Sequence, residues 1–540
     1  MAVSIPLHFL VLLPVGVGAV GYFLPRRWYH LALLVMNIAI LALSILTFIE
    51  VRWGAQIIQH IAGWPDWIAI KLVADKYSAP LVVLTAIFFA GTFVFSTRAD
   101  YTDKTFLFLF VMLESALIGV FLSGDIFNIY VLIELGMIAI AILIMYKQDK
   151  QSVYDAMLYL MMNFIAMAFM LLGIGYLYRI TGVLDLDALV ARLPLLDNPR
   201  AVIVPYAMIM TAIALKSALF PLFSWLPRAH GAPSAPGIVS AVLSGVQVKA
   251  GVYLLVRLSA VFSPVIDATP FFMVLGFVTS VVGFLLAIAQ KDIKLILAYH
   301  TVSQVGLIVM GLNLGSDVAF WGAMYHIINH ALFKGLLFLT AGVIIEEYGS
   351  RSYAEIRGVL RRMPAIGIGT LAGVLGITGA PFFNGSISKY FIQQGLQGDF
   401  GGIGMFLINL GTTLSFVKYS LILFGKPSVA PDRPLRRDPW VAGVSLVFGI
   451  ACLAGGLLGG PTVALVYGPQ YSAGGALSAE KITTFVVTLA LAVALYALVV
   501  RRIGGFLASI RQFKFSFNQI TVVLTLFFVG LLGYTWWAGG

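Results

Sequence analysis

Long apolar stretches separated by short polar connections are the dominant feature of this sequence. Of its 540 residues, 60% are hydrophobic and 11% are charged, whereas soluble domains carry about 25% charged residues. A helix needs about 20 apolar residues to cross the hydrocarbon core of a bilayer. Sixteen stretches fit this requirement, near residues 5–25, 28–49, 77–97, 105–122, 126–146, 153–179, 202–226, 232–257, 268–289, 294–313, 317–343, 364–398, 402–424, 439–460, 481–500 and 519–537. We therefore expect an all-α polytopic membrane protein with about 14–16 transmembrane helices.

Basic residues are distributed unevenly between the two sets of connections. If the N-terminus lies outside, the outer loops and ends hold few of them, namely Arg52, Lys71, Lys76, Arg192, Arg200 and Lys481. The inner loops hold most of the others, as the positive-inside rule requires. The formal net charge of +11 is thus a topology signal and does not indicate a nucleic-acid partner. Both termini are predicted to lie outside.

Motifs of soluble catalysis and of cofactor binding are missing from the sequence. Cys452 is the only cysteine, which excludes an intrachain disulfide and a cysteine-held metal or iron–sulfur cluster. The chain has no Walker motif, CxxC, HExxH or GxSxG, and no GxGxxG that opens a helix. The first apolar stretch lacks a basic start and a cleavage site, so it is read as a retained helix. We expect neither a cofactor nor a resident metal.

Three connecting segments have a composition of their own. The segment 50–76, with Trp64 and Trp67, is predicted to form a small interfacial hairpin with its tryptophans at headgroup level. The proline-rich basic stretch Lys426–Asp438 indicates a boundary between a core and a C-terminal extension. The basic stretch Arg501–Asn518, with interleaved phenylalanines, is predicted to lie along the inner membrane surface.

Two of the predicted spans are interrupted next to a lysine. Lys216 begins KSALFPLFSWLP, which contains Pro221 and Pro227. Lys389 ends GITGAPFFNGSISK, which contains Pro381. Proline removes a helix hydrogen bond, and freed backbone groups within a membrane need protein or water partners. Because the lysine precedes one break and follows the other, the pattern indicates an inverted repeat with a site at mid-membrane.

Acidic residues within the predicted spans are candidate proton carriers. Glu134 lies about ten residues into its span, roughly 15 Å deep at 1.5 Å per residue, and Glu114 lies similarly deep in the preceding span. Lys216 is the expected partner of Glu134. The pair is interpreted as a switch in which withdrawal of the carboxylate lets the lysine release its proton. The alternative for Glu134 and Lys216 is a fixed salt bridge, and for Glu114 a structural ion pair or hydrogen bond.

Further charged residues lie within the apolar segments or at their ends. Lys249 lies in GIVSAVLSGVQVKAGVYLL, whose small residues allow close helix approach, and Lys389 is the candidate for the last carrier of the line. Lys418 is nearer to an inner end, where a lysine that snorkels toward water is the preferred interpretation. Asp125 precedes a helix and is expected to cap its N-terminus; a role at a proton or cation mouth is the alternative.

Two histidines and a lysine repeat every four residues in MYHIINHALFKGLLF. His326, His330 and Lys334 therefore share one face of a helix. Histidine titrates near neutral pH, which favours a proton relay. The alternatives are core hydrogen bonding and a metal site, although no adjacent carboxylate or cysteine completes such a site. His300, with Gln304 one turn later, is a further candidate.

These segments together resemble the antiporter-like subunits shared by Mrp-type cation/proton antiporters, complex I and membrane-bound hydrogenases, and most of all the Mrp D-type large subunit. The resemblance is carried by GDIFNIYVLIEL, LKSALFPLFSWLPRAHGAPSAPGIVSAVLSGVQVKAGVY, DIKLILAYHTVSQVG, HIINHALFKGLLFLTAG and ITGAPFFNGSISK, which span about residues 105–425. It implies two inverted five-helix repeats, each with a broken helix, at 105–257 and 268–425. N-terminal helices (1–104) precede them, and C-terminal helices with the basic inner-surface segment (426–540) follow.

The resemblance also implies roles for individual residues. Glu134 and Lys216 match the paired glutamate and broken-helix lysine, and Lys249 matches a central lysine. The MYHIINHALFK segment matches the link region, and Lys389 matches the second broken-helix lysine. The chain departs from the family pattern where it continues beyond the usual core, with spans near 481–500 and 519–537.

Three functions compete at this point. The leading hypothesis is a proton-translocating subunit of a multisubunit Mrp-type Na⁺/H⁺ antiporter in a prokaryotic inner membrane, with H⁺ and Na⁺ as substrates and other membrane subunits as partners. The alternative is a proton-pumping subunit of a complex I-related redox complex. A structural scaffold is the third. In each case the chain is one part of a larger assembly and not an enzyme by itself.

Overall fold

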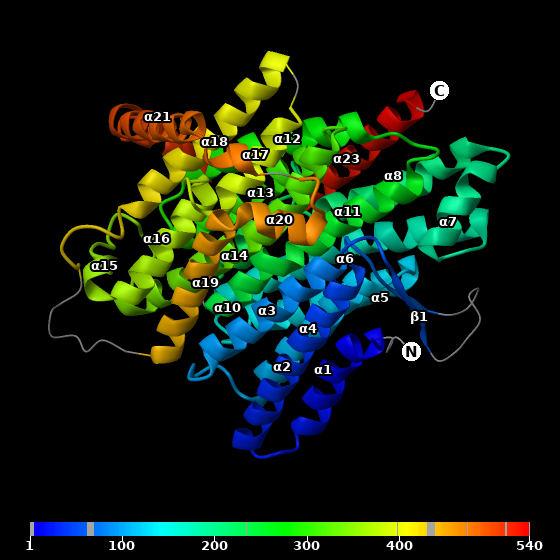
Figure 1. Ribbon diagram of the computed structural model, residues 1–540, viewed down its shortest axis with the longest axis horizontal. Helices are drawn as coiled ribbons and strands as arrows, with labels where there is room; N and C mark the ends of the chain where they lie inside the picture. The colour runs from blue at the N-terminus through cyan, green and yellow to red at the C-terminus, as the bar shows by residue number, and fades with distance from the viewer. Residues whose placement is uncertain are drawn as a thin grey trace.

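The computed structural model is a bundle of long helices (Figure 1). It describes residues 5–61, 70–233, 235–396, 398–428, 438–471, 473–512 and 516–538. Thirteen helices within these ranges are long and apolar enough to cross a membrane, and two shorter apolar helices are Leu7–Gly21 and Pro364–Thr378. The predicted all-α polytopic architecture is confirmed.

The N-terminal half of the chain contains the only strands among the described residues. Its elements are α1 (Leu7–Gly21), α2 (Arg26–Val51), β1 (Ile57–His60), β2 (Lys71–Ala74), α3 (Ala79–Ser96), α4 (Lys104–Leu122), α5 (Ile126–Ile144), α6 (Lys150–Thr181), α7 (Leu186–Arg192), η2 (Leu193–Leu195), η3 (Pro199–Val202), α8 (Ile203–Lys216), α9 (Trp225–Gly231), α10 (Gly237–Val242), η4 (Leu243–Gln247) and α11 (Val248–Phe262). Aspartates begin several of these helices because a carboxylate accepts the free N–H groups of the first turn. Asp125 caps α5 in this way, as predicted, and accepts from the Asn128 N–H at 2.7 Å.

The second half repeats the pattern of long and broken helices. Its elements are α12 (Thr269–Ala289), α13 (Ile293–Leu312), α14 (Asp317–Tyr348), α15 (Val359–Arg362), α16 (Pro364–Thr378), α17 (Asn384–Gln394) and α18 (Gly398–Ser420). The C-terminal extension consists of α19 (Pro439–Leu457), α20 (Gly459–Tyr467), η5 (Gly474–Leu477), α21 (Ala479–Leu495), η6 (Tyr496–Val500), α22 (Gly504–Gln512) and α23 (Phe517–Ala538).

Both predicted breaks are present. The first interrupts the chain between α8 and α9, and the second between α16 and α17. Each contains a non-glycine residue with left-handed backbone, Ala218 at φ 53° and Phe382 at φ 70°. Such residues cost of order 1–3 kcal/mol and persist only where the surrounding structure holds them in place. The helices around the two breaks must therefore hold these residues in their strained conformation.

The start of α1 and the end of α23 lie on the face that carries the hairpin. Strands β1 and β2 pair antiparallel, with Ile57 opposite Ala74. The His8 backbone N–H donates to Gln59 in β1, and the Arg200 guanidinium lies 5.6 Å from the Trp536 ring near the C-terminus. Figure 1 shows both ends on the same side as β1 and α7. The predicted hairpin is confirmed, while its tip with Trp64 and Trp67 falls outside the described residues.

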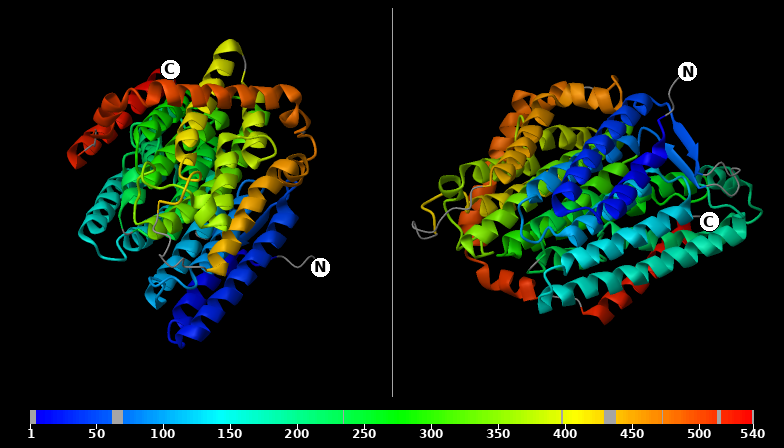
Figure 2. Two further views of the ribbon diagram at one scale, coloured as in Figure 1. Left: turned by 90° about the vertical axis from the view of Figure 1, so that its left-hand side faces the viewer. Right: turned by 90° about the horizontal axis from the view of Figure 1, so that it is seen from below.

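The C-terminal extension packs against the outside of the core. Helix α21 packs on α18, α22 packs on α12, and α23 packs on α8 and α6. Figure 2 shows α21 lying across the outside of the bundle before the chain turns into α23. Most of the proline-rich stretch before α19 and residues 513–515 after α22 lie outside the described residues.

Candidate functional site: a buried line of lysine and histidine side chains

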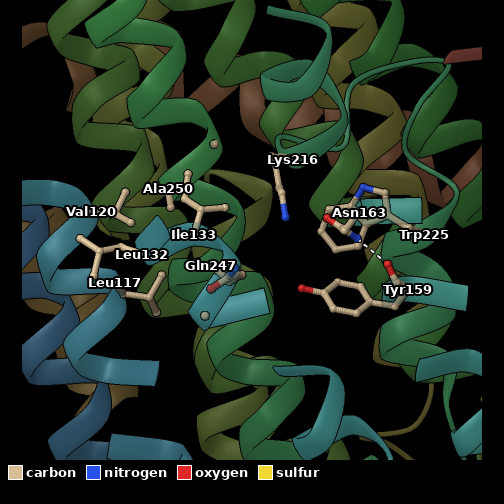
Figure 3. Close-up of a pocket in the computed structure, with 12 residues that line it drawn as sticks. Leu117, Val120, Leu132, Ile133, Tyr159, Asn163, Lys216, Trp225, Gln247 and Ala250 are labelled. Carbon is tan, nitrogen blue, oxygen red and sulfur yellow. Dashed lines mark hydrogen bonds between the residues drawn. The ribbon is translucent and has the colours of Figure 1, made fainter. Parts of the chain in front are cut away.

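Lys216 is the last residue of α8 and points into a small cavity. The cavity has a volume of about 10 Å³ and is lined by Tyr159, Asn163, Trp225 and Gln247, among others. Figure 3 shows the lysine between Gln247 on one side and Asn163 with Tyr159 on the other. Among the described residues, the side-chain oxygens of Gln247 and Asn163 have no hydrogen-bond partner. The space fits about one water, which those oxygens would hold beside the ammonium group.

The first residue of α9 adds a side-chain hydrogen bond to the broken end of α8. The Trp225 indole N–H donates to the Leu215 carbonyl at 2.7 Å. A carbonyl freed at the end of a membrane helix needs such a partner. The Leu215 carbonyl also accepts from the Ala218 backbone N–H at 2.9 Å, so it has two donors where the break exposes Lys216 to the cavity.

Lys216 and Glu134 do not form the expected direct pair. No ion pair joins them among the described residues, and the Lys216 Nζ instead lies 3.4 Å from the Met137 Sδ. Glu134 is half-buried on α5, and its charge acts on Lys216 without contact. The separation arises because Met137, three residues after Glu134, is the α5 side chain that faces the lysine.

Lys249 connects the two halves of the bundle. It follows η4, a single π-helical turn that ends at Gln247, and π turns recur at functional sites in membrane and soluble helices. Its ammonium group donates to the Ser244 carbonyl and lies 2.6 Å from the Nδ1 of His330 on α14. Lys249 and His330 are fully buried. A residue of the first half and one of the second half are therefore in direct contact.

His326 continues the line toward the second break. The ring centroids of His326 and His330 are 6.3 Å apart. The Nε2 of His326 lies 3.0 Å from the Gln304 Oε1 on α13, and its Nδ1 lies 2.8 Å from the Ser388 Oγ on α17. Ser388 directly precedes Lys389, so the line ends beside the second broken-helix lysine.

Lys389 reaches back across its own break. Its Nζ donates to the Ile377 carbonyl at 2.9 Å, at the C-terminal end of α16, where the helix dipole favours a positive charge. The same side chain lines a polar cavity of about 90 Å³. Lys389 thus has one contact inside the bundle and an open side toward the cavity.

Three other predicted residues are buried without a hydrogen bond to this line. Lys334 donates to the Leu297 carbonyl on α13. His300 packs against Phe416, and neither of its ring nitrogens has a partner among the described residues. Both carboxylate oxygens of Glu114 are buried and likewise have no partner within the described ranges. In the part of the chain that the structure describes, none of the three shares a hydrogen bond with a member of the line.

The interpretation of Lys418 as a snorkelling lysine is wrong. Its side chain is 2% exposed, and its Nζ donates to the carbonyls of Ala287, Ile288 and Gln290 at 3.1, 2.5 and 2.7 Å. These carbonyls end α12, where an ammonium group replaces the missing helix partners. The burial arises because the end of α12 packs against α18 and covers the lysine.

Sequence reasoning missed His230 and Lys294. His230, on the short helix α9, is fully buried and stacks on Phe338 with ring centroids 4.3 Å apart. Its ring nitrogens have no partner in the described part of the chain. Lys294, in the first turn of α13, is buried and donates to the Ala235 carbonyl at 2.9 Å. The sequence signal for His230 is its position three residues after Pro227, within the interrupted segment.

The arrangement provides proton donors and acceptors. No group of three histidine, cysteine, aspartate or glutamate side chains suited to a metal occurs among the described residues. Lys249 and His330 share one hydrogen bond, which requires that one of the two nitrogens accepts. The site can therefore hold a proton in alternative positions.

Comparison with known proteins gives a consistent result. Residues 123–416 match the family model described as NADH:quinone oxidoreductase/Mrp antiporter, TM. The chain is 35% identical over 345 residues to the N-type subunit of the NADH-quinone oxidoreductase of Desulforudis audaxviator, covering 62% of this chain and 68% of that protein. It is 31% identical over 364 residues to the D-type subunit of the Na⁺/H⁺ antiporter of Alkalihalophilus pseudofirmus, covering 65% and 72%.

Two solved structures share the fold. A chain of the Mrp complex from Dietzia matches with a TM-score of 0.80 at 23% identity, covering 91% of this chain and 100% of that one. A chain of an archaeal membrane-bound sulfane sulfur reductase matches with a TM-score of 0.78 at 24% identity, covering 89% and 99%.

Proposed function

The chain belongs to the NADH:quinone oxidoreductase/Mrp antiporter transmembrane family, and we propose that it is the proton-translocating subunit of a multisubunit Na⁺/H⁺ antiporter. The contact between Lys249 and His330 carries this proposal, because it links the two halves of the bundle through titratable groups. Protons pass in sequence along Lys216, Lys249, His330, His326 and Lys389. The route runs largely parallel to the membrane plane between the two broken helices.

The proposed transfer at the centre follows from hydrogen-bond chemistry. An ammonium group has donors only, and a neutral imidazole offers one acceptor nitrogen. When Lys249 carries the proton, His330 accepts its hydrogen bond at Nδ1. Transfer makes the imidazole positive and Lys249 neutral, and the positive charge then favours proton departure from His330 toward His326.

Glu134 acts as a distant control of Lys216 in this proposal. A positive lysine within the membrane costs roughly 2.5–3.5 kcal/mol on insertion scales, and a nearby carboxylate offsets part of that cost. Glu134 supplies such a charge without direct contact. Movement of α5 toward α8 would favour protonation of Lys216. Movement of α5 away would release the proton toward the water site beside Gln247.

The redox alternative has its own support. The match at 35% identity to a NADH-quinone oxidoreductase subunit favours a chain that pumps protons within an electron-transfer complex. The proposed residues would carry protons in the same way, with the energy supplied by partner subunits. Purification of the intact complex separates the two functions: small hydrophobic antiporter subunits support the first, and iron–sulfur or nickel–iron subunits support the second.

The experiment that tests the antiporter proposal is cation-dependent dissipation of a pH gradient. Membrane vesicles with the whole complex are energised, and Na⁺, K⁺ or Li⁺ is added to wild type and to Lys216→Ala. We expect Na⁺ to collapse the gradient in wild type and not in the variant. Unchanged activity in assembled Lys216→Ala would overturn the proposed route.

A further inference from the structure

The cavity beside Lys389 extends to the C-terminal extension. It has a volume of about 90 Å³, and its polar lining comes from the second break, from α18 and from α21: Thr378, Ser386, Lys389, Gln393, Asn409, Thr413, Lys481, Thr484 and Thr488. Since about 10–15 Å³ of this volume suffices for one water, the cavity has room for several. The side-chain oxygen of Asn409 is buried and has no partner among the described residues.

Helix α21 presents two contrasting faces. Lys481, Thr484 and Thr488 line the cavity at the spacing of one helical face. Val486 and Val487 do not line the cavity, and each is 56% exposed. A helix that only covers the core would not need a polar stripe toward an interior lysine. The stripe fits a wall that has water on one side and lipid on the other.

The threonine hydroxyls of α21 are arranged to accept hydrogen bonds from water. Thr484 donates to the Glu480 carbonyl and Thr488 to the Thr484 carbonyl, both within the helix. Each hydroxyl oxygen then keeps its acceptor capacity free. Thr488 is 4% exposed, so its hydroxyl lies deep in the lining, while Lys481 reaches Gln393 at 3.3 Å near the first turn of α21.

We infer that α21 forms the outer wall of a hydrated port through which Lys389 exchanges protons with water. Thr488 positions water in this port. The inference rests on the proposed function, in which Lys389 is the last carrier. It assigns the C-terminal extension a part in transport: without α21, the cavity would open to hydrocarbon, which offers no hydrogen-bond partners.

Cysteine labelling tests the port directly. Cys452, the only cysteine of this chain, is buried, and labelling of the wild-type complex gives the background rate. Thr488→Cys and its lipid-facing neighbour Val487→Cys are treated in vesicles with a small membrane-impermeant methanethiosulfonate, which reacts with the thiolate that forms only in a wet environment. We expect Thr488→Cys to react at least tenfold faster. Equal slow rates would overturn the port.

A second set of three variants tests the hydroxyl. Thr488→Val removes it at nearly constant volume, Thr488→Ser retains it, and Val487→Thr is the control on the lipid face. We expect at least a tenfold loss of proton translocation in Thr488→Val alone. Full activity of Thr488→Val would overturn the role of Thr488. The Lys389→Ala variant distinguishes failure of the proposed function from failure of the port. Full activity of Lys389→Ala would refute the proposed function. An inactive Lys389→Ala, together with full activity of Thr488→Val and no labelling of Thr488→Cys, would refute only the port.

Discussion

The Nζ of Lys249 lies 2.6 Å from the Nδ1 of His330 in the middle of the bundle. This hydrogen bond connects α11 of the first half with α14 of the second half. Both side chains are fully buried, and a charged group there must exchange its proton with a protein neighbour or an enclosed water. The contact is the step of the proposed route that joins the two halves, so changes at either residue should stop transport.

Replacement of His330 should abolish most proton translocation. His330→Ala removes the acceptor of Lys249, and loss of a positioned proton carrier typically costs on the order of 10²- to 10⁴-fold. His8 provides a matched control, since its ring contacts Gln59 near the hairpin, far from the line, and His8→Gln should transport normally. Proton flux is measured with a pH-sensitive dye in vesicles. Wild-type flux in His330→Ala would exclude His330 from the route.

Lys418→Met should weaken the structure without stopping transport. The variant leaves the carbonyls at the end of α12 without their shared ammonium donor, and hydrogen bonds to a charged group contribute about 1.5–3 kcal/mol. We expect a lower unfolding temperature of the detergent-solubilised complex together with near-normal flux per assembled complex. Loss of flux at normal stability would instead place Lys418 in the transport machinery.

Lys418 also shows where prediction from sequence stops. Position near the end of an apolar stretch indicated an exposed lysine, but the packing of α18 against α12 decides its surroundings, and a sequence does not specify that pairing. The same limit applies to Lys216 and Glu134, whose separation depends on which face α5 presents to α8. Asp125 was predictable because a helix cap is local. The helix breaks were predictable because proline acts on its own backbone.

Gly385→Ala should disturb the second break. A Cβ at this position would overlap the Gly376 carbonyl oxygen, so α16 and α17 would have to separate, at a cost of about 1–3 kcal/mol. Lys389 would lose its position at the end of α16, and flux should fall. The control is Gly402→Ala, where a Cβ meets no atom within 4 Å. Identical stability and flux of the two variants would contradict the close contact.

The hairpin is held to α7 by Lys71, whose stabilising effect should depend on pH. Its Nζ lies 2.7 Å from Asp185 Oδ2 and 2.6 Å from Asp187 Oδ2. Burial disfavours the charged lysine, but the hydrogen bonds to both carboxylates outweigh it and raise the pKa above the ordinary 10.5. The contribution of Lys71 to the free energy of unfolding is therefore complete below about pH 10.5. It is lost as the pH rises through the raised pKa of the lysine.

Lys71→Met should accordingly lower the free energy of unfolding by about 1–2 kcal/mol at neutral pH. The difference from wild type should shrink in alkaline solution. Thermal unfolding followed across a pH series measures it, and Asp187→Asn should reproduce part of the loss. A difference between Lys71→Met and wild type that stays constant to high pH would show that the ion pairs do not stabilise the hairpin.

We propose that the buried lysines of the line move protons and that burial alone does not give a lysine this role. Lys249 and Lys418 are matched for the test, since both are buried and both donate to backbone carbonyls. Cation-dependent dissipation of the pH gradient is measured for the intact complex in vesicles, with assembly checked for each variant. We predict that Lys249→Met abolishes the response and that Lys418→Met retains it. A normal response in assembled Lys249→Met would contradict the account.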